Sequence, residues 1–221
     1  MSTMAALTQN GRTFLLLNAD VEAGGDNGVH IDREAGGLVR VADSGGVPIA
    51  TAGAMSRLGL ALLFLPADAG ASRLSKILLD CRDVCSALAR IEAEAAHSPT
   101  LPDGQVLLGD SDCIALVRYG AGRAECETRE TGLLVCATSV AGDGGGNGQP
   151  DDVLRGDAMR GLVEELYAWL PTLDNEDVVE RCQGGLCKEP LYTAHTRYSL
   201  VVDVQEHRME CAMRGAPWKA L

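Results

Sequence analysis

The sequence predicts an α+β fold in which a largely antiparallel sheet is packed by two amphipathic helices. The first reason is a run of short apolar strands between residues 105 and 139, separated by glycine-containing turns. The second is a pair of segments, 72–98 and 151–170, in which apolar residues recur at steps of three and four. The third is composition, because 46% of the 221 residues are hydrophobic and supply a sizeable core.

The first part of the chain predicts a strand and a hairpin. Phe14–Leu17 is typical of a short strand, and Leu38–Val41 and Val47–Thr51 flank an Asp-Ser-Gly-Gly turn that favours a β-hairpin. Pro48 cannot donate to a ladder, so we expect its strand to lie at an edge or to begin there. Residues 54–65 form a continuous apolar run without a period, which fits either a buried helix or a buried strand.

The first helix is expected between Ser72, a suitable N-cap, and the stop at Ser98 and Pro99. One face of this segment is apolar and the opposite face is charged, as in a surface helix that covers a core. The apolar face consists of Leu74, Ile77, Leu78, Cys81, Val84, Cys85, Leu88, Ile91 and Ala95.

The second helix is expected to start at Asp151 or Asp152 and to end before Pro171. A shorter helix over residues 174–182 should follow and stop at Gly184 and Gly185. The apolar stripe of the second helix is Met159, Leu162, Val163, Leu166, Trp169 and Leu170.

The remaining elements complete the predicted domain plan. A meander is expected from Gln105–Leu108, Cys113–Tyr119, Glu125–Thr128 and Leu133–Thr138, and a last strand alternates from Tyr198 to Val204. The sequence therefore predicts a single α/β domain over residues 1–171, with a flexible glycine-rich loop at 141–150. Residues 172–221 form a C-terminal extension that completes or flanks the sheet.

Charge and hydropathy restrict the partners and the compartment. The formal net charge is −12 and the pI is about 4.7, which disfavours nucleic acid as a partner. The longest apolar run, Leu58 to Leu65, is too short for membrane insertion, and the first ten residues lack the pattern of a secretory signal. We expect an intracellular, cytoplasmic protein whose partner is another protein, a basic one suiting the acidic surface.

The sequence lacks the motifs of the common enzyme classes. It has only four histidines, and no Gly-x-Ser-x-Gly, His-Glu-x-x-His, P-loop or strand-associated Gly-x-Gly-x-x-Gly pattern. A nucleophile also needs a base and an orienting group, and no such set is visible. The sequence therefore predicts a non-catalytic interaction or scaffold subunit of a larger complex, with no cofactor, rather than an enzyme.

The C-terminal region contains candidate zinc ligands. Cys182 and Cys187 have Cys-x4-Cys spacing, and His207 and Cys211 have His-x3-Cys spacing, as thiolates and imidazoles around a tetrahedral zinc ion would require. His195 is a substitute ligand. Cys182 also falls on the apolar face of a predicted helix, so it fits a plain core residue equally well. A small zinc-stabilised binding module is thus one alternative function.

A glycine-rich segment near the N-terminus offers a second alternative. Residues 17–20, Leu-Asn-Ala-Asp, are followed by glycines up to residue 37, and the segment resembles the Asn-Ala-Ala-Asn to Gly-Gly-Gly-Val region of macro domains. The resemblance implies that ADP-ribose or a related nucleotide is the ligand, because glycines let backbone amides approach a phosphate. The residues it implies are Asn18, Asp20, Gly24, Gly25 and Asp26.

The order of the predicted elements also resembles a known class of small scaffolds. A hairpin, a long amphipathic helix, a meander and a further helix are similar to the order found in roadblock and longin domains. That resemblance implies an adaptor in a regulatory complex.

Overall fold

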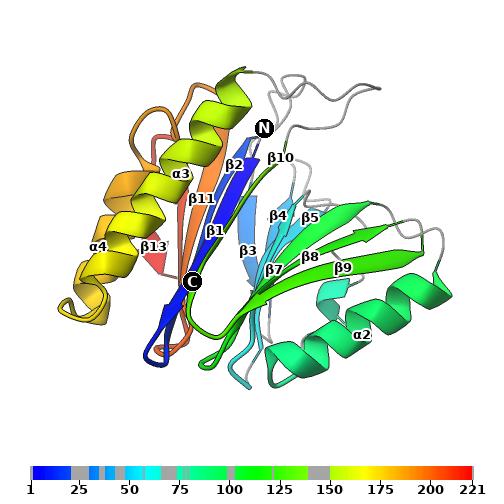
Figure 1. Ribbon diagram of the computed structural model, residues 1–221. Helices are drawn as coiled ribbons and strands as arrows, with labels where there is room; N and C mark the ends of the chain where they lie inside the picture. Colours follow the sequence, from blue (N-terminus) through cyan, green and yellow to red (C-terminus); the bar gives the residue numbers. More distant parts are fainter. Residues whose placement is uncertain are drawn as a thin grey trace.

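The computed structural model describes residues 2–20, 30–34, 38–42, 48–56, 58–65, 74–76, 78, 80–98, 103–120, 122–138 and 150–220. Its strands form two antiparallel sheets that lie face to face between helices (Figure 1). The α+β class predicted by the sequence is confirmed. The predicted roadblock-like and longin-like order of elements is not confirmed, because the strands divide between two sheets.

The first sheet brings together both ends of the chain. Its order is β10-β1-β2-β11-β12-β13. These strands are β1 (Ser2–Gln9), β2 (Arg12–Asp20), β10 (Gly132–Thr138), β11 (Thr196–Asp203), β12 (Arg208–Met213) and β13 (Lys219–Ala220).

The second sheet runs in chain order from β3 to β9 and contains the predicted hairpin. Pro48 opens β5 and pairs with Ala42, next to a register shift in the β4–β5 ladder. Residues 54–65 resolve into the end of β5 and all of β6. The strands are β3 (His30–Glu34), β4 (Leu38–Ala42), β5 (Pro48–Met55), β6 (Ala61–Leu65), β7 (Gly104–Gly109), β8 (Ile114–Gly120) and β9 (Arg123–Arg129).

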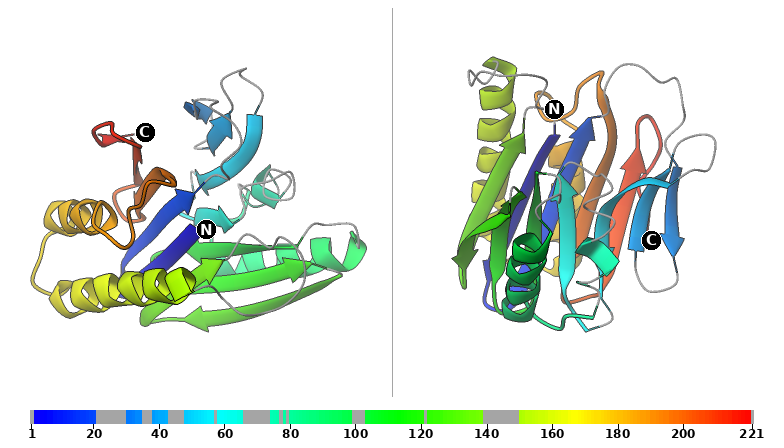
Figure 2. Two further views of the ribbon diagram at one scale, coloured as in Figure 1. Left: turned by 90° about the horizontal axis from the view of Figure 1, so that it is seen from above. Right: turned by 90° about the vertical axis from the view of Figure 1, so that its right-hand side faces the viewer.

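Three apolar layers hold the sheets and helices together. Alternation along β2 sends Leu15 and Leu17 into the core between the sheets, and Phe14 and Leu16 toward α3 (Pro150–Trp169) and α4 (Asn175–Leu186). The outer face of the second sheet packs on α2 (Val84–His97). Figure 2 shows α3 and α4 together beside the first sheet. No helix within the described ranges is both long and apolar enough to cross a bilayer.

The helices differ from the predictions at their ends. The helix predicted over 72–98 is interrupted, because Asp83 and Ser86 form a capping box that starts α2 at Val84. Its predicted end at Ser98 is confirmed. Helix α4 continues through Gly184 and Gly185, where a Cβ at Gly185 would collide with Leu162 of α3. The predicted N-cap Ser72 and the glycine-rich loop at 141–149 lie outside the described residues.

The sheets approach closely at one end and diverge at the other. At Gly109 a Cβ would lie 2.6 Å from Leu15 Cδ1 across the interface. From there β8 and β9 splay away from β1 and β10, toward the end of the molecule where the N-terminus lies (Figure 1). The candidate site lies at this diverging end.

Candidate functional site

Ser2 is the first residue of β1 and lies at the diverging end of the two sheets. It pairs with Thr138 in the ladder, and its strand neighbours Met4 and Ala6 face the core between the sheets. Alternation therefore directs Ser2 to the same face. The residue is 7% exposed, and its Oγ accepts a hydrogen bond from the Asp20 backbone N–H at 3.1 Å.

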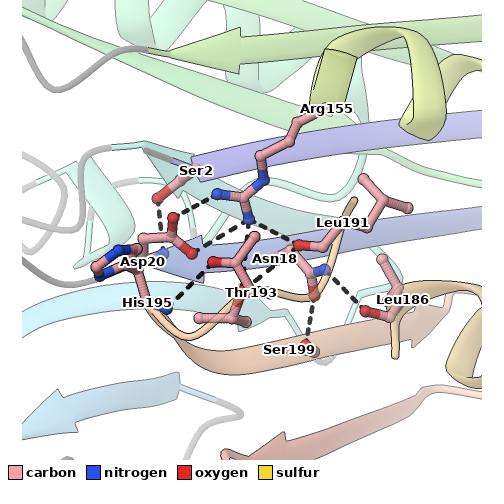
Figure 3. Close-up of polar contacts among 10 residues, drawn as sticks. Ser2, Asn18, Asp20, Arg155, Leu186, Leu191, Thr193, His195 and Ser199 are labelled. Carbon is pink, nitrogen blue, oxygen red and sulfur yellow. Dashed lines mark hydrogen bonds and ion pairs between the residues drawn. The ribbon is translucent and has the colours of Figure 1, made fainter. Parts of the chain in front are cut away.

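Asp20 ends β2 and forms a buried ion pair with Arg155 of α3 (Figure 3). Arg155 Nη2 donates to Asp20 Oδ1 at 3.2 Å, and Nη1 donates to Asp20 Oδ2. Nη2 also donates to the Leu191 carbonyl at 2.7 Å. The guanidinium thus fixes the carboxylate in a fork geometry, and the paired charges offset each other's desolvation. The backbone that contacts Ser2 is held in place by this pair.

Asn18 lies on the same strand but has a structural role. Its Nδ2 donates to the Leu186 carbonyl at 2.9 Å, and its Oδ1 accepts a hydrogen bond from Ser199 Oγ. These bonds tie β2 to the end of α4 and to β11, as Figure 3 shows. Both the nitrogen and the oxygen of this fully buried side-chain amide are therefore hydrogen-bonded inside the protein.

The predicted nucleotide-binding residues do not form a free site. Asn18 and Asp20 are engaged by Ser199, Leu186 and Arg155, so neither is available to orient a ribose. The other three residues of that prediction, Gly24, Gly25 and Asp26, lie outside the described ranges.

The predicted zinc ligands do not come together. Cys182 is buried between α4 and the first sheet, whereas Cys211 is buried between the two sheets, on the opposite face of the first sheet. Cys187 is exposed at the end of α4, and His207 lies in the turn before β12. His195 is exposed before β11. Among the described residues, no group of three or more His, Cys, Asp or Glu could hold a metal ion.

The inter-sheet face of the first sheet carries two buried cysteines, Cys136 on β10 and Cys211 on β12. Burial raises the pKa of Cys136 to about 11, although the nearby Arg118 cation and a hydrogen bond with Gln105 lower it. Burial also raises the pKa of Cys211 to about 12. Because a thiol reacts as its thiolate, neither cysteine is a nucleophile at neutral pH. Ser2, by contrast, presents a hydroxyl with an ordered hydrogen-bond partner at the diverging end of the sheets.

Two residues of this site were missed by the sequence interpretation. Arg155 precedes Met159 by four residues and so falls on the apolar stripe of α3, where it is 4% exposed. A cation on a predicted core face was the available signal, because a buried arginine requires a partner. Ser2 had no such signal, because β1 itself was not predicted.

No protein-family model and no curated protein sequence matches the chain. Penicillin V acylase from Agrobacterium tumefaciens has a similar structure, with a TM-score of 0.60 at 14% identity, covering 99% of this chain and 85% of that chain. A mutant of conjugated bile acid hydrolase from Clostridium perfringens matches with a TM-score of 0.59 at 11% identity, covering 100% and 92%.

A third similar structure is the Caenorhabditis elegans ortholog of N-acylethanolamine-hydrolyzing acid amidase. Its TM-score is 0.56 at 10% identity, and the match covers 100% of both chains. The prediction of a non-catalytic scaffold or adaptor is therefore wrong, because the proteins that share this two-sheet architecture are an acylase, a hydrolase and an amidase. At these identities the similarity shows a shared fold.

Proposed function

We propose that this protein is an amide hydrolase whose nucleophile is Ser2. The observation that carries the proposal is the position of Ser2, which opens β1 with its Oγ bonded to the Asp20 N–H. The crystallised bile acid hydrolase mutant has alanine in place of the second residue of that protein, a cysteine. Serine and cysteine both serve as nucleophiles in covalent catalysis.

The proposed reaction requires that the peptide bond before Ser2 be broken, so that its α-amino group is free. That amine then accepts the Oγ proton while Oγ forms a bond to the carbonyl carbon of the substrate amide. The C–N bond breaks, the leaving amine takes the proton, and an acyl ester remains on Oγ. Water attacks the ester as the α-amine takes its proton. The carboxylic acid leaves, and Oγ is protonated again.

The surrounding residues position this nucleophile. The Asp20 N–H donates to Ser2 Oγ and so stabilises negative charge as the hydroxyl loses its proton. Arg155 holds the Asp20 carboxylate, and thereby the end of β2, against α3. Asp20 and Arg155 are therefore positioning residues in this scheme, and Ser2 is the catalytic residue.

The names of the similar structures support the type of bond that is cleaved. One is an acylase, one a hydrolase of conjugated bile acids and one an acid amidase. We therefore propose a small N-acyl amide as the substrate of this chain.

A removable N-terminal tag tests the need for a free Ser2 amine. The chain is produced with a tag that ends in a protease site directly before Ser2, and hydrolysis of a panel of N-acyl amides is measured before and after the tag is cut. We expect activity only after cutting, and none for Ser2→Ala treated in the same way. Mass spectrometry of the cut protein mixed with substrate should detect an acyl adduct on Ser2. Equal activity of the uncut, cut and Ser2→Ala proteins would refute the mechanism.

A further inference from the structure

Arg118 lies on the face of β8 that points toward the first sheet, and the other residues on that face are apolar. Ile114 and Leu116 of this strand are buried in the core between the sheets, and Val117 and Tyr119 face α2 on the other side. Alternation directs Arg118 to the same face as Ile114 and Leu116. Unlike them, Arg118 is exposed.

The position of Arg118 is connected to Ser2 through contacts across the interface. Arg118 pairs in register with Gln105 of β7, and the side chain of Gln105 contacts Cys136 Sγ of β10. Cys136 is two residues from Thr138, which pairs with Ser2. Two residues along a strand span about 7 Å. Arg118 and Ser2 therefore lie on the facing sides of the two sheets, on either side of the Gln105–Cys136 contact.

The charge of Arg118 is not neutralised by a close ion pair. Within the described part of the chain, its guanidinium has neither a hydrogen bond nor an ion pair, although Glu125 lies opposite it in the β8–β9 register. Acidic residues outnumber basic ones by 31 to 19 in this protein. An exposed arginine on this face is thus a local exception to an acidic chain, and its planar fork matches a carboxylate in two parallel hydrogen bonds.

We propose that Arg118 binds a carboxylate of the substrate and makes this protein selective for anionic N-acyl amides. The inference rests on the proposed function, since it assigns the substrate class of the Ser2 site. A substrate held by Arg118 on one wall places its amide toward Ser2 on the other. Glu125 opposes this binding, because its carboxylate competes for the same guanidinium.

Two matched pairs of probes distinguish a carboxylate from its neutral analogue. N-decanoylglycine and N-decanoylglycinamide differ at the amine side of the scissile amide, and a glutaryl anilide and its terminal carboxamide differ at the acyl side. Binding to the Ser2→Ala protein is measured by calorimetry, which does not depend on turnover. We expect the acid of at least one pair to bind tenfold or more tightly than its amide. Arg118→Gln should remove this preference, and Arg118→Lys should retain part of it.

Control variants separate Arg118 from a general change in charge. Arg129→Gln removes the same charge at the opposite end of the neighbouring strand, where Arg129 is paired with Glu127, and should leave the preference intact. Glu125→Gln should tighten binding of the acids and not of the amides. The subsite is overturned if neither acid binds better than its amide, or if Arg118→Gln keeps the preference.

Turnover assays show which of the two proposals fails. If carboxylate-selective binding is lost in Arg118→Gln but no amide is hydrolysed by the cut protein, the subsite stands and the hydrolase mechanism is wrong. If amides are hydrolysed through Ser2 and the acid and amide of each pair have equal kcat/KM, the mechanism stands and the subsite is wrong. Added salt should weaken the acid preference, because it screens a solvent-exposed charge.

Discussion

The Arg155 guanidinium and the Asp20 carboxylate form an ion pair in which the side chains are only 4% and 5% exposed. The pair joins the start of α3 to the end of β2, two segments that are 135 residues apart. The Asp20 backbone N–H contacts Ser2 Oγ directly. The placement of the candidate nucleophile therefore depends on the docking of a helix from the second half of the chain.

Breaking this ion pair should destabilise the protein and reduce its activity. Arg155→Met removes the cation that is paired with the buried Asp20 carboxylate, and we expect the free energy of unfolding to fall by about 3–5 kcal/mol. Urea unfolding would measure this loss. The double variant Arg155→Met with Asp20→Asn should recover part of the stability, because no buried charge remains. Arg160→Met, on the exposed face of the same helix, serves as the control and should change stability little.

Replacing the proposed nucleophile by cysteine should change the chemistry of inactivation. Ser2→Cys should hydrolyse amides and lose activity with iodoacetamide, whereas the wild-type activity should survive the reagent. The reason is that the buried Cys136 and Cys211 have pKa values of about 11 and about 12 and are protonated at neutral pH. Mass spectrometry should find wild-type modification at the exposed thiols, Cys85, Cys126 and Cys187. Loss of wild-type activity on alkylation would instead indicate an essential native thiol.

Local features of the sequence predicted individual elements, and long-range pairing decided the site. The hairpin of β4 and β5 and the strands β7 to β10 were predicted from alternation and turns, which are properties of neighbouring residues. That β10 leaves the meander to pair with β1 follows from contacts about 130 residues apart. The same limit explains the incorrect zinc set, because spacing alone did not place Cys182 and Cys211 on opposite faces of one sheet.

Two glycine substitutions should have opposite effects on stability. At Gly109 a new Cβ would lie 2.6 Å from Leu15 Cδ1 and 3.0 Å from Thr13 Cγ2, where the two sheets approach closely. Gly109→Ala should therefore cost about 1–3 kcal/mol through overpacking. Gly161 is exposed in α3 with no atom within 4 Å of a Cβ, and Gly161→Ala should add about 0.5–1 kcal/mol. Thermal unfolding of both variants would show whether the sheets can move apart at Gly109.

The buried carboxyl of Asp203 should make stability depend on pH. This residue ends β11 and is 1% exposed, and burial raises the pKa of its carboxyl above the ordinary value of 3.8, although the Glu206 N–H donates to it. Between the unfolded and folded pKa values, the folded state binds more protons than the unfolded state. The contribution of Asp203 to stability therefore falls as pH rises through that range. At neutral pH the charged carboxylate therefore lowers the free energy of unfolding.

Asp203→Asn should remove this cost while its side-chain oxygen still accepts the Glu206 N–H. We expect the variant to be more stable than the wild type at pH 7, and the difference to shrink as the pH is lowered through the folded pKa and to vanish well below 3.8, where the wild-type carboxyl is protonated in both states. Unfolding in urea at several pH values measures the difference, with the exposed Asp157→Asn on α3 as the control. A variant less stable than the wild type at pH 7 would mean that the turn at residues 203–206 needs the charge on its acceptor, and that this hydrogen bond outweighs desolvation.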